Sequence, residues 1–191
     1  VKLALVSHGF TIEQRQRRLD TIDRSNATVM AVANLNMAPK PGVDKILNNI
    51  EHLMYVVHRY RKQIEYFHVL GVTSKFWLFI YALLDALGYV KEIGGDSVTH
   101  RLGGITGKYD LVDFRSIDLK KNDKLRKGAK CTCPVCVHVD DLRVIAHASI
   151  IEAHSLYIRA RRTELMSNMA KTYVSGGVPL HSVYEQLSPT T

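Results

Sequence analysis

The three cysteines of this 191-residue chain all lie in the segment KCTCPVCVHVDD. They are Cys131, Cys133 and Cys136, and Pro134 between them favours a tight turn. Three thiols this close do not suit an ordinary disulfide framework, whereas soft sulfur ligands on one loop favour Zn²⁺. Free buried or reactive cysteines and an iron–sulfur cluster are the alternatives. A zinc site with four protein ligands would be structural and not catalytic.

A structural zinc site needs a fourth ligand, and three histidines compete for that place. His138 follows the last cysteine so closely that a chelate on the same loop would be strained. His147 and His154 both lie in residues 140–169, a segment with a mainly helical pattern that could fold back onto the loop. The residues alone therefore predict one zinc ion per chain and leave the choice of histidine open.

The formal net charge of +8 favours a polyanionic partner, because contacts with phosphate groups release counterions. The alternative is that the basic residues are solvated helix faces. The expected nucleic-acid contacts lie beside the cysteine loop and in the helical segment after it: Lys120, Lys121, Lys124, Arg126, Lys127, Lys130, Arg159, Arg161 and Arg162.

The composition is that of a soluble globular protein, with 46% hydrophobic and 23% charged residues. The longest apolar run, FWLFIYALLDAL, is too short to span a bilayer and carries Asp85. The chain does not open with a signal-peptide pattern. We therefore expect a cytoplasmic protein with no membrane partner, a setting in which clustered cysteines bind metal before they form disulfides.

Short apolar segments alternate with helical patterns through the first half of the chain. Such alternation with short joints predicts a parallel sheet of the α/β class, and four strands with three helices would make about half of a (β/α)8 TIM-type barrel. The strands are expected at residues 2–8, 27–35, 65–72 and 89–96, and the helices at 11–24, 41–62 and 74–88.

The alternation stops after this point. Residues 108–119 have the pattern of a strand or hairpin, and the cysteine loop and the helical segment follow. We expect a half barrel over residues 1–100, a zinc-binding subdomain with the C-terminal helix over 101–173, and a loose tail over 174–191.

With this arrangement, the run CTCPVC resembles the zinc-binding run of the tRNA-guanine transglycosylase superfamily. That superfamily includes queuine, preQ1 and archaeal enzymes that act on tRNA, and phage or bacterial relatives that place 7-deazaguanines in DNA. The resemblance covers residues 1–169 but only the C-terminal half of a typical member. The segment EAHSLYIRARRTEL resembles the family helix HNL…Y, which implies that His154 is the fourth zinc ligand and makes His147 the runner-up.

The same resemblance implies a site for base exchange. The segment GGDSVTHRLGG is similar to the family's FDC/S…R, in which the aspartate at a strand end is the nucleophile, so it implies that role for Asp96. Arg101 follows it and could meet a phosphate or support Asp96, or belong to a plain loop. The segments HVLGVTS and LVSHG stand where the family has its base-pocket motifs MGVG(T/S) and VQGG. They imply substrate contacts from Leu70, Gly71, Ser7 and Gly9.

Base exchange breaks a glycosidic bond through an oxocarbenium-like centre, which a carboxylate can trap covalently as in retaining glycosidases. Without the resemblance, a turn or a helix cap is the favoured interpretation of an aspartate after Gly94 and Gly95. Protons at the two bases need a second carboxylate, which in the family comes from a DSGGFQ segment that this sequence does not contain. We therefore expect one half of a larger enzyme, whose open sheet edges require another copy or a partner chain.

Three functions remain open on the sequence. The first is a pentosyltransferase that exchanges a base in tRNA or DNA for a 7-deazaguanine, with Zn²⁺ bound. The second is a non-catalytic, zinc-bearing nucleic-acid-binding subunit of a split or heteromeric transglycosylase. The third is an unrelated zinc-stabilised α/β protein.

Overall fold

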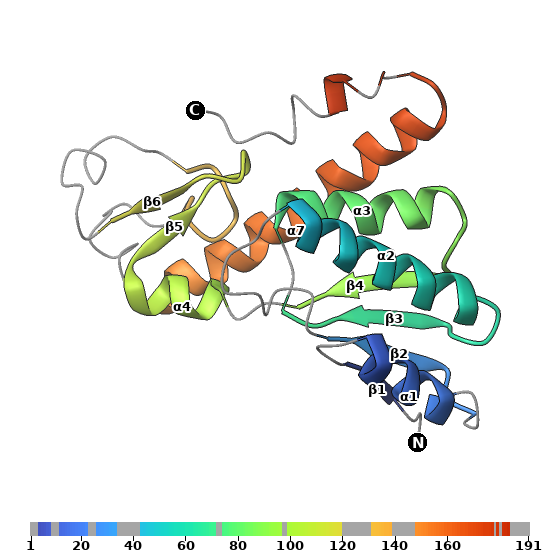
Figure 1. Cartoon of the computed structure of the whole chain (residues 1–191). Helices are drawn as coiled ribbons and strands as arrows, with labels where there is room; N and C mark the ends of the chain where they lie inside the picture. The colour runs from blue at the N-terminus through green and yellow to red at the C-terminus, as the bar shows by residue number, and fades with distance from the viewer. Residues whose placement is uncertain are drawn as a thin grey trace. The chain divides into compact units, whose positions relative to one another are not determined.

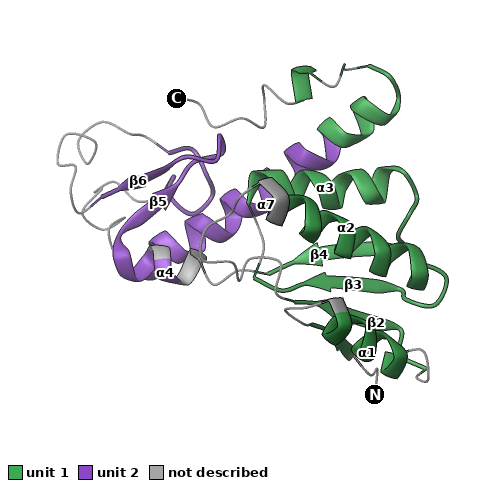
Figure 2. Cartoon of the chain, in the orientation of Figure 1, with its two compact units in different colours: residues 1–97, 169–191 green, residues 98–168 purple. Residues whose placement is uncertain are grey.

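The computed structural model of the chain (Figure 1) describes residues 4–8, 12–22, 26–33, 43–71, 74–96, 99–119, 131–138, 148–177, 179 and 181–183. The chain forms two compact units (Figure 2). The first comprises residues 1–97 and 169–191, and the second comprises residues 98–168. None of the helices in the described ranges is long and apolar enough to span a membrane.

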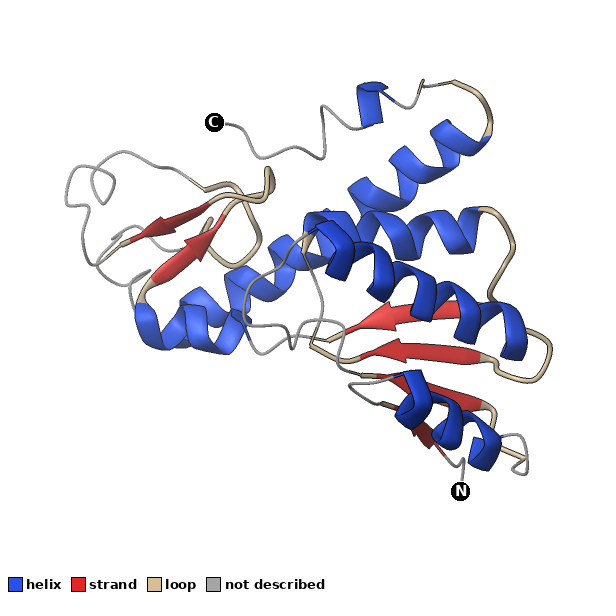
Figure 3. Cartoon of the chain, in the orientation of Figure 1, coloured by secondary structure: helices blue, strands red, loops and turns tan. Residues whose placement is uncertain are grey.

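A parallel four-stranded sheet forms the centre of the first unit (Figure 3). Across the sheet the strands follow the order of the sequence, which is β1 (Ala4–Ser7), β2 (Val29–Val32), β3 (Tyr66–Val69) and β4 (Glu92–Gly95). Helices α1 (Ile12–Ile22), α2 (Val43–Tyr60) and α3 (Lys75–Ala86) alternate with them. The predicted strands, helices and α/β class are therefore confirmed.

Helix α3 shows how the sequence sets the ends of these elements. Ser74 occupies its N-cap position, and Gly88 after its end has a φ of +67°, a conformation that glycine adopts without strain. The Gly88 and Tyr89 N–H groups donate to the carbonyl oxygens of Asp85 and Leu84, each at 2.9 Å. This is a Schellman motif, which satisfies carbonyl groups that the helix itself leaves unpaired.

The three helices cover one face of the sheet. Alternate residues of β2 and β3 on this face are fully buried, since Met30, Val32, Phe67 and Val69 are each 0% exposed. They join one hydrophobic cluster to which all three helices contribute, so this burial supplies the main stabilisation of the unit. The helical members of the cluster are Leu19, Ile22, Leu53, Val56, Val57, Tyr60, Trp77, Tyr81 and Leu84.

The opposite face of the sheet does not take part in this hydrophobic cluster. The strand register places Val6, Ala31, His68 and Gly94 in one row across it. None of these side chains belongs to the hydrophobic cluster of the described residues; Val6 is 42% exposed, whereas Ala31 is buried. Parallel sheets are normally covered on both faces. Val6 on this face therefore lacks, among the described residues, the cover that the helices give to the other face.

Buried His52 on α2 should make the first unit sensitive to acid. His52 is 7% exposed, and burial, with a smaller effect from Arg15, lowers its pKa from 6.5 to about 4. Below pH 6.5 the unfolded chain takes up a proton that the folded chain excludes, so stability is complete above that pH and falls as the pH drops towards 4. Between pH 7 and pH 5 we expect a loss of roughly 2 kcal/mol in unfolding free energy from this residue.

Urea unfolding followed by the fluorescence of Trp77 at pH 7 and pH 5 measures this loss. His52→Leu should remove it. His58→Leu is the matched control, because His58 lies on the same helix but is exposed. An equal pH dependence in the wild type and in His52→Leu would contradict the assignment.

The second unit contains α4 (Thr99–Thr106), an antiparallel hairpin of β5 (Lys108–Asp110) and β6 (Ser116–Asp118), the cysteine loop and residues 148–168 of α7 (Ala148–Val174). The predicted hairpin and C-terminal helix are confirmed. The sequence does not predict α4, because its two glycines disfavour a helix. Close packing requires a glycine at position 104, because a Cβ there would lie 2.6 Å from the carbonyl oxygen of Ala148 at the start of α7.

Candidate metal centre and candidate active site

The cysteine loop folds into a turn that gathers its sulfur atoms. The N–H groups of Cys136 and Val137 donate to the carbonyl oxygen of Cys133 at 3.0 and 2.9 Å. The Cys136 N–H also lies 3.3 Å from the Cys133 Sγ. Cys133 and Cys136 are buried, and Cys131 is half-buried.

His154 on α7 completes the group. Its Nδ1 lies 3.8, 3.3 and 3.4 Å from the Sγ atoms of Cys131, Cys133 and Cys136, and the four atoms lie within 4.8 Å of one another. Ligand atoms that share one tetrahedral zinc ion are separated by roughly 3.5–3.8 Å, given Zn–S and Zn–N distances of about 2.3 and 2.0 Å. The residues therefore fit a single metal ion, and the prediction that these four cluster is confirmed.

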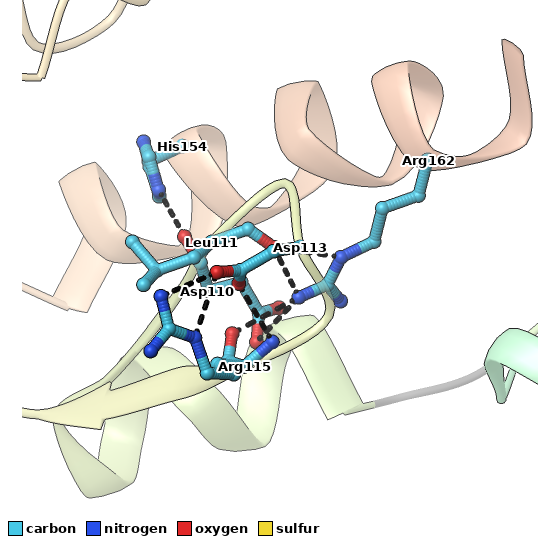
Figure 4. Close-up of polar contacts among 6 residues, drawn as sticks. All are labelled: Asp110, Leu111, Asp113, Arg115, His154 and Arg162. Carbon is cyan, nitrogen blue, oxygen red and sulfur yellow. Dashed lines mark hydrogen bonds and ion pairs between the residues drawn. The ribbon is translucent and has the colours of Figure 1, made fainter. Parts of the chain in front are cut away.

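The second ring nitrogen of His154 is held by the hairpin. Its Nε2 lies 2.7 Å from the carbonyl oxygen of Asp110 (Figure 4). A carbonyl oxygen only accepts, so Nε2 carries the hydrogen and Nδ1 presents its lone pair to the sulfurs. The ring of Tyr109 stacks on the imidazole, with centroids 3.7 Å apart. Burial lowers the pKa of His154, which keeps the imidazole in the neutral form that a metal ligand requires.

The competing histidines take no part in this cluster as far as the structure describes them. His138 is exposed and is not among the grouped residues. His147 lies outside the described residues, as do Lys120, Lys121, Lys124, Arg126, Lys127 and Lys130.

Among the described residues, the apolar packing around the metal centre is small. It consists of five buried residues, with a few half-buried neighbours such as Val135 and Tyr157 packed against them. A core of this size supplies little stability without a crosslink or a metal. The five are Tyr109, Leu119, Cys133, Cys136 and Ile151.

Arg162 on α7 holds the turn of the hairpin (Figure 4). Its Nε and Nη2 donate to the carbonyl oxygen of Leu111 at 2.9 and 2.6 Å, and Nη2 also donates to that of Arg115 at 3.2 Å. The guanidinium carbon lies 4.8 Å from the centre of the Phe114 ring, and Phe114 has a φ of +70°, which is rare for a residue other than glycine. Arg162 is only 8% exposed, and its guanidinium is bonded to the hairpin. It is therefore not accessible for the nucleic-acid contact that the sequence predicts.

Arg162→Ala should therefore destabilise the second unit by about 1–3 kcal/mol, because it removes the buried charged donor that bonds the carbonyl groups of the hairpin turn. Arg161→Ala is the matched control. Arg161 is exposed and pairs with Glu164 at 2.5 Å, an ion pair worth less than about 1 kcal/mol. Amide hydrogen exchange in β5 and β6 measures the difference. Equal protection in the two variants would contradict the anchoring role of Arg162.

The other two arginines expected to contact nucleic acid differ from each other. Arg161 points its guanidinium to the exposed Glu164. Arg159 is half-buried, and that burial lowers its pKa. Of the three helix arginines, Arg161 is therefore the one with the most exposed side chain.

Asp96 directly follows β4, at the carboxyl end of the sheet. Its Oδ1 accepts a hydrogen bond from the Gly71 N–H at 2.7 Å, and its Oδ2 lies 3.3 Å from the Nε2 of His68. The Gly71 donor, and to a lesser extent His68, hold the pKa of Asp96 below its ordinary value. The side chain is 57% exposed. The structure thus presents an ionised carboxylate that is fixed by two neighbours and still accessible.

His68 connects Asp96 to Tyr66, and the sequence predictions include neither residue. The Tyr66 hydroxyl lies 3.0 Å from the Nδ1 of His68. A strand alternates its side chains, so Tyr66 and His68 share one face of β3, and the sequence contains this signal. Their proximity to Asp96 depends on the pairing of β3 with β4, which the sequence does not reveal.

The remaining predicted substrate contacts are distributed unequally around Asp96. Gly71 touches it, and Leu70, the residue before, donates its N–H to the carbonyl oxygen of Val32 at 2.9 Å. Ser7 is 0% exposed and, by strand alternation, lies on the helix-covered face, opposite to the face of His68. Gly9 and the side chain of Arg101 lie outside the described residues.

The two sites differ in chemistry. One gathers three sulfurs and an imidazole that fit a metal ion, and the other presents an ionised carboxylate at a strand end. Comparison with protein-family models gives no match to this chain, and comparison with curated proteins gives none either. The choice among the three functions that the sequence leaves open therefore depends on the residues and geometry of these two sites.

Proposed function

We propose that this chain is the zinc-bearing half of a transglycosylase that exchanges a base in tRNA or DNA for a 7-deazaguanine, with Asp96 as the covalent nucleophile. The observation that carries the proposal is the ionised, accessible carboxylate of Asp96 at the carboxyl end of a parallel strand. Catalytic groups of (β/α)8 barrels lie at this end of the strands. The resemblance of the surrounding segments to the transglycosylase superfamily supports the same role.

In this proposal the four strands are half of a (β/α)8 barrel. Two observations support it: the strands follow one another in sequence order across the sheet, and α1, α2 and α3 pack on the same face of it. In a closed barrel the row of Val6, Ala31, His68 and Gly94 on the other face would line the interior. Four more strands would come from the other half of the barrel, which would also bring the second carboxylate, because this sequence has no DSGGFQ segment.

The reaction assigns distinct tasks to the two halves. A carboxylate oxygen of Asp96 forms a bond to the sugar carbon while the glycosidic C–N bond breaks, and the electron pair leaves with the departing base. That base takes a proton from the acid of the other half. The incoming base then attacks the same sugar carbon, loses its proton to that group and releases Asp96 as a carboxylate.

The metal in this proposal is Zn²⁺, held by Cys131, Cys133, Cys136 and His154. Three thiolates and an imidazole are ligands that zinc prefers, and four protein ligands leave no open position for catalysis. Zinc would therefore fix the loop, the hairpin and α7 in one structure. The net charge of +8 supports nucleic acid as the partner.

The test is incorporation of a labelled 7-deazaguanine into tRNA and into duplex DNA by the chain together with a partner that carries the acid/base carboxylate. We expect label in one of the two polynucleotides. Binding of polynucleotide without incorporation into either would favour the non-catalytic subunit, a function that the missing DSGGFQ segment also fits.

A further inference from the structure

We propose that Tyr66 and His68 form a hydrogen-bonded relay that positions the carboxylate of Asp96 for attack, and this rests on the proposed function of Asp96. The relay runs from the Tyr66 hydroxyl to the Nδ1 of His68 over 3.0 Å, and from the Nε2 of His68 to the Oδ2 of Asp96 over 3.3 Å. Tyr66 and His68 are thus positioning residues that act through Asp96.

The chemistry of the three groups fixes the direction of the relay. An ionised carboxylate only accepts hydrogen bonds, so the Nε2 of His68 carries the hydrogen that faces Asp96. In the neutral imidazole the Nδ1 is then an acceptor, and the Tyr66 hydroxyl is its donor. Burial, and then the charges of Glu92 and Asp96, raise the pKa of Tyr66, so the phenol keeps the proton that it donates.

A glycine on the neighbouring strand leaves space for the relay. His68 pairs with Gly94 on β4, and a Cβ at Gly94 would lie only 3.0 Å from the Tyr66 hydroxyl oxygen. The missing side chain therefore leaves the space in which this hydroxyl reaches His68. A glycine at position 94 therefore allows Tyr66 to take this position.

The relay and the loop after β3 hold the two oxygens of Asp96 separately. Gly71 donates to Oδ1, and the Nε2 of His68 faces Oδ2 at 3.3 Å, so the plane of the carboxylate is fixed while each oxygen keeps a lone pair for attack. Besides Tyr66 and His68, the titratable groups whose interaction with this site the structure shows are Glu92 on β4 and Tyr81 on α3.

Nuclear magnetic resonance of the full chain tests the relay without any substrate. We expect the wild type to show His68 as the Nε2–H tautomer in its ring nitrogen shifts. His68→Leu should raise the titration midpoint of the Asp96 carboxyl carbon, although the Gly71 bond persists. His68→Gln keeps an N–H donor, so its midpoint should stay close to that of the wild type. His58→Leu, on the exposed face of α2, is the control and should change neither signal.

Two further variants address Tyr66. Tyr66→Phe removes the donor to Nδ1, so the preference of His68 for one tautomer should weaken. Gly94→Ala should have the same effect, because the added Cβ meets the Tyr66 hydroxyl. The Nδ1–H tautomer in the wild type, or an Asp96 midpoint that is unchanged in His68→Leu, would overturn the relay.

Base exchange by the chain with its partner then tests what the relay does. His68→Leu should lower kcat about 10- to 100-fold with little change in KM, the effect of losing one charge-assisted hydrogen bond to the attacking group. His68→Gln should recover most of the rate, whereas a merely structural role would give no such recovery. If the wild type exchanges no base, the proposed function fails, and the resonance measurements still decide the relay.

Discussion

Asp96→Asn should abolish the covalent adduct between the complete enzyme and nucleic acid while binding of the polynucleotide persists. Asparagine keeps the shape of the side chain and can still accept the Gly71 hydrogen bond, but it lacks the charge that meets the oxocarbenium centre. We expect base exchange to fall by several orders of magnitude, because covalent and electrostatic stabilisation are lost together. Denaturing gel electrophoresis with labelled nucleic acid and scarce incoming base measures the adduct.

Asp85→Asn is the matched control, since Asp85 is an exposed aspartate on α3 of the same unit. This variant should form the adduct at the wild-type level. Near-normal base exchange in Asp96→Asn would rule out the nucleophile. Asp96 would then be a structural residue that caps the loop after β3 through the Gly71 N–H.

Loss of a metal ligand should unfold the second unit. The free energy of metal binding in small structural zinc sites is about 10–16 kcal/mol, which exceeds what the five-residue cluster around the metal centre can supply. Cys133→Ser, or a strong chelator added to the wild type, should therefore remove the dispersed amide resonances of α4, β5 and β6. The fluorescence of Trp77, which lies in the first unit, reports separately on the sheet and its helices.

Elemental analysis of the freshly purified chain should give one zinc per chain. His138→Ala is the control for the choice of ligand. Because His138 is exposed, this variant should keep its metal. His154→Ala should lose the metal. Full metal content in His154→Ala, or dispersed resonances of the second unit in metal-free protein, would contradict the assignment.

The sequence determined those features that depend on neighbouring residues. Hydrophobic periodicity located the four strands and three helices, and Ser74 and Gly88 located the ends of α3, because helix and strand preferences act over a few residues. The spacing of the cysteines likewise identified three residues of the possible metal site, since one short turn brings them together. The carboxyl-end position of Asp96 followed from the parallel sheet that this alternation predicts.

Only the tertiary structure decided which distant residues meet. His154 joins the cysteines because α7 and the hairpin place its Nδ1 there, whereas sequence spacing alone left three histidines open. Arg161 and Arg162 are neighbours of equal charge, yet one is exposed and the other is buried against the hairpin. The relay of Tyr66 and His68 also depends on the register of β3 with β4. Such contacts join residues far apart in the chain, and their energy depends on packing that no local pattern encodes.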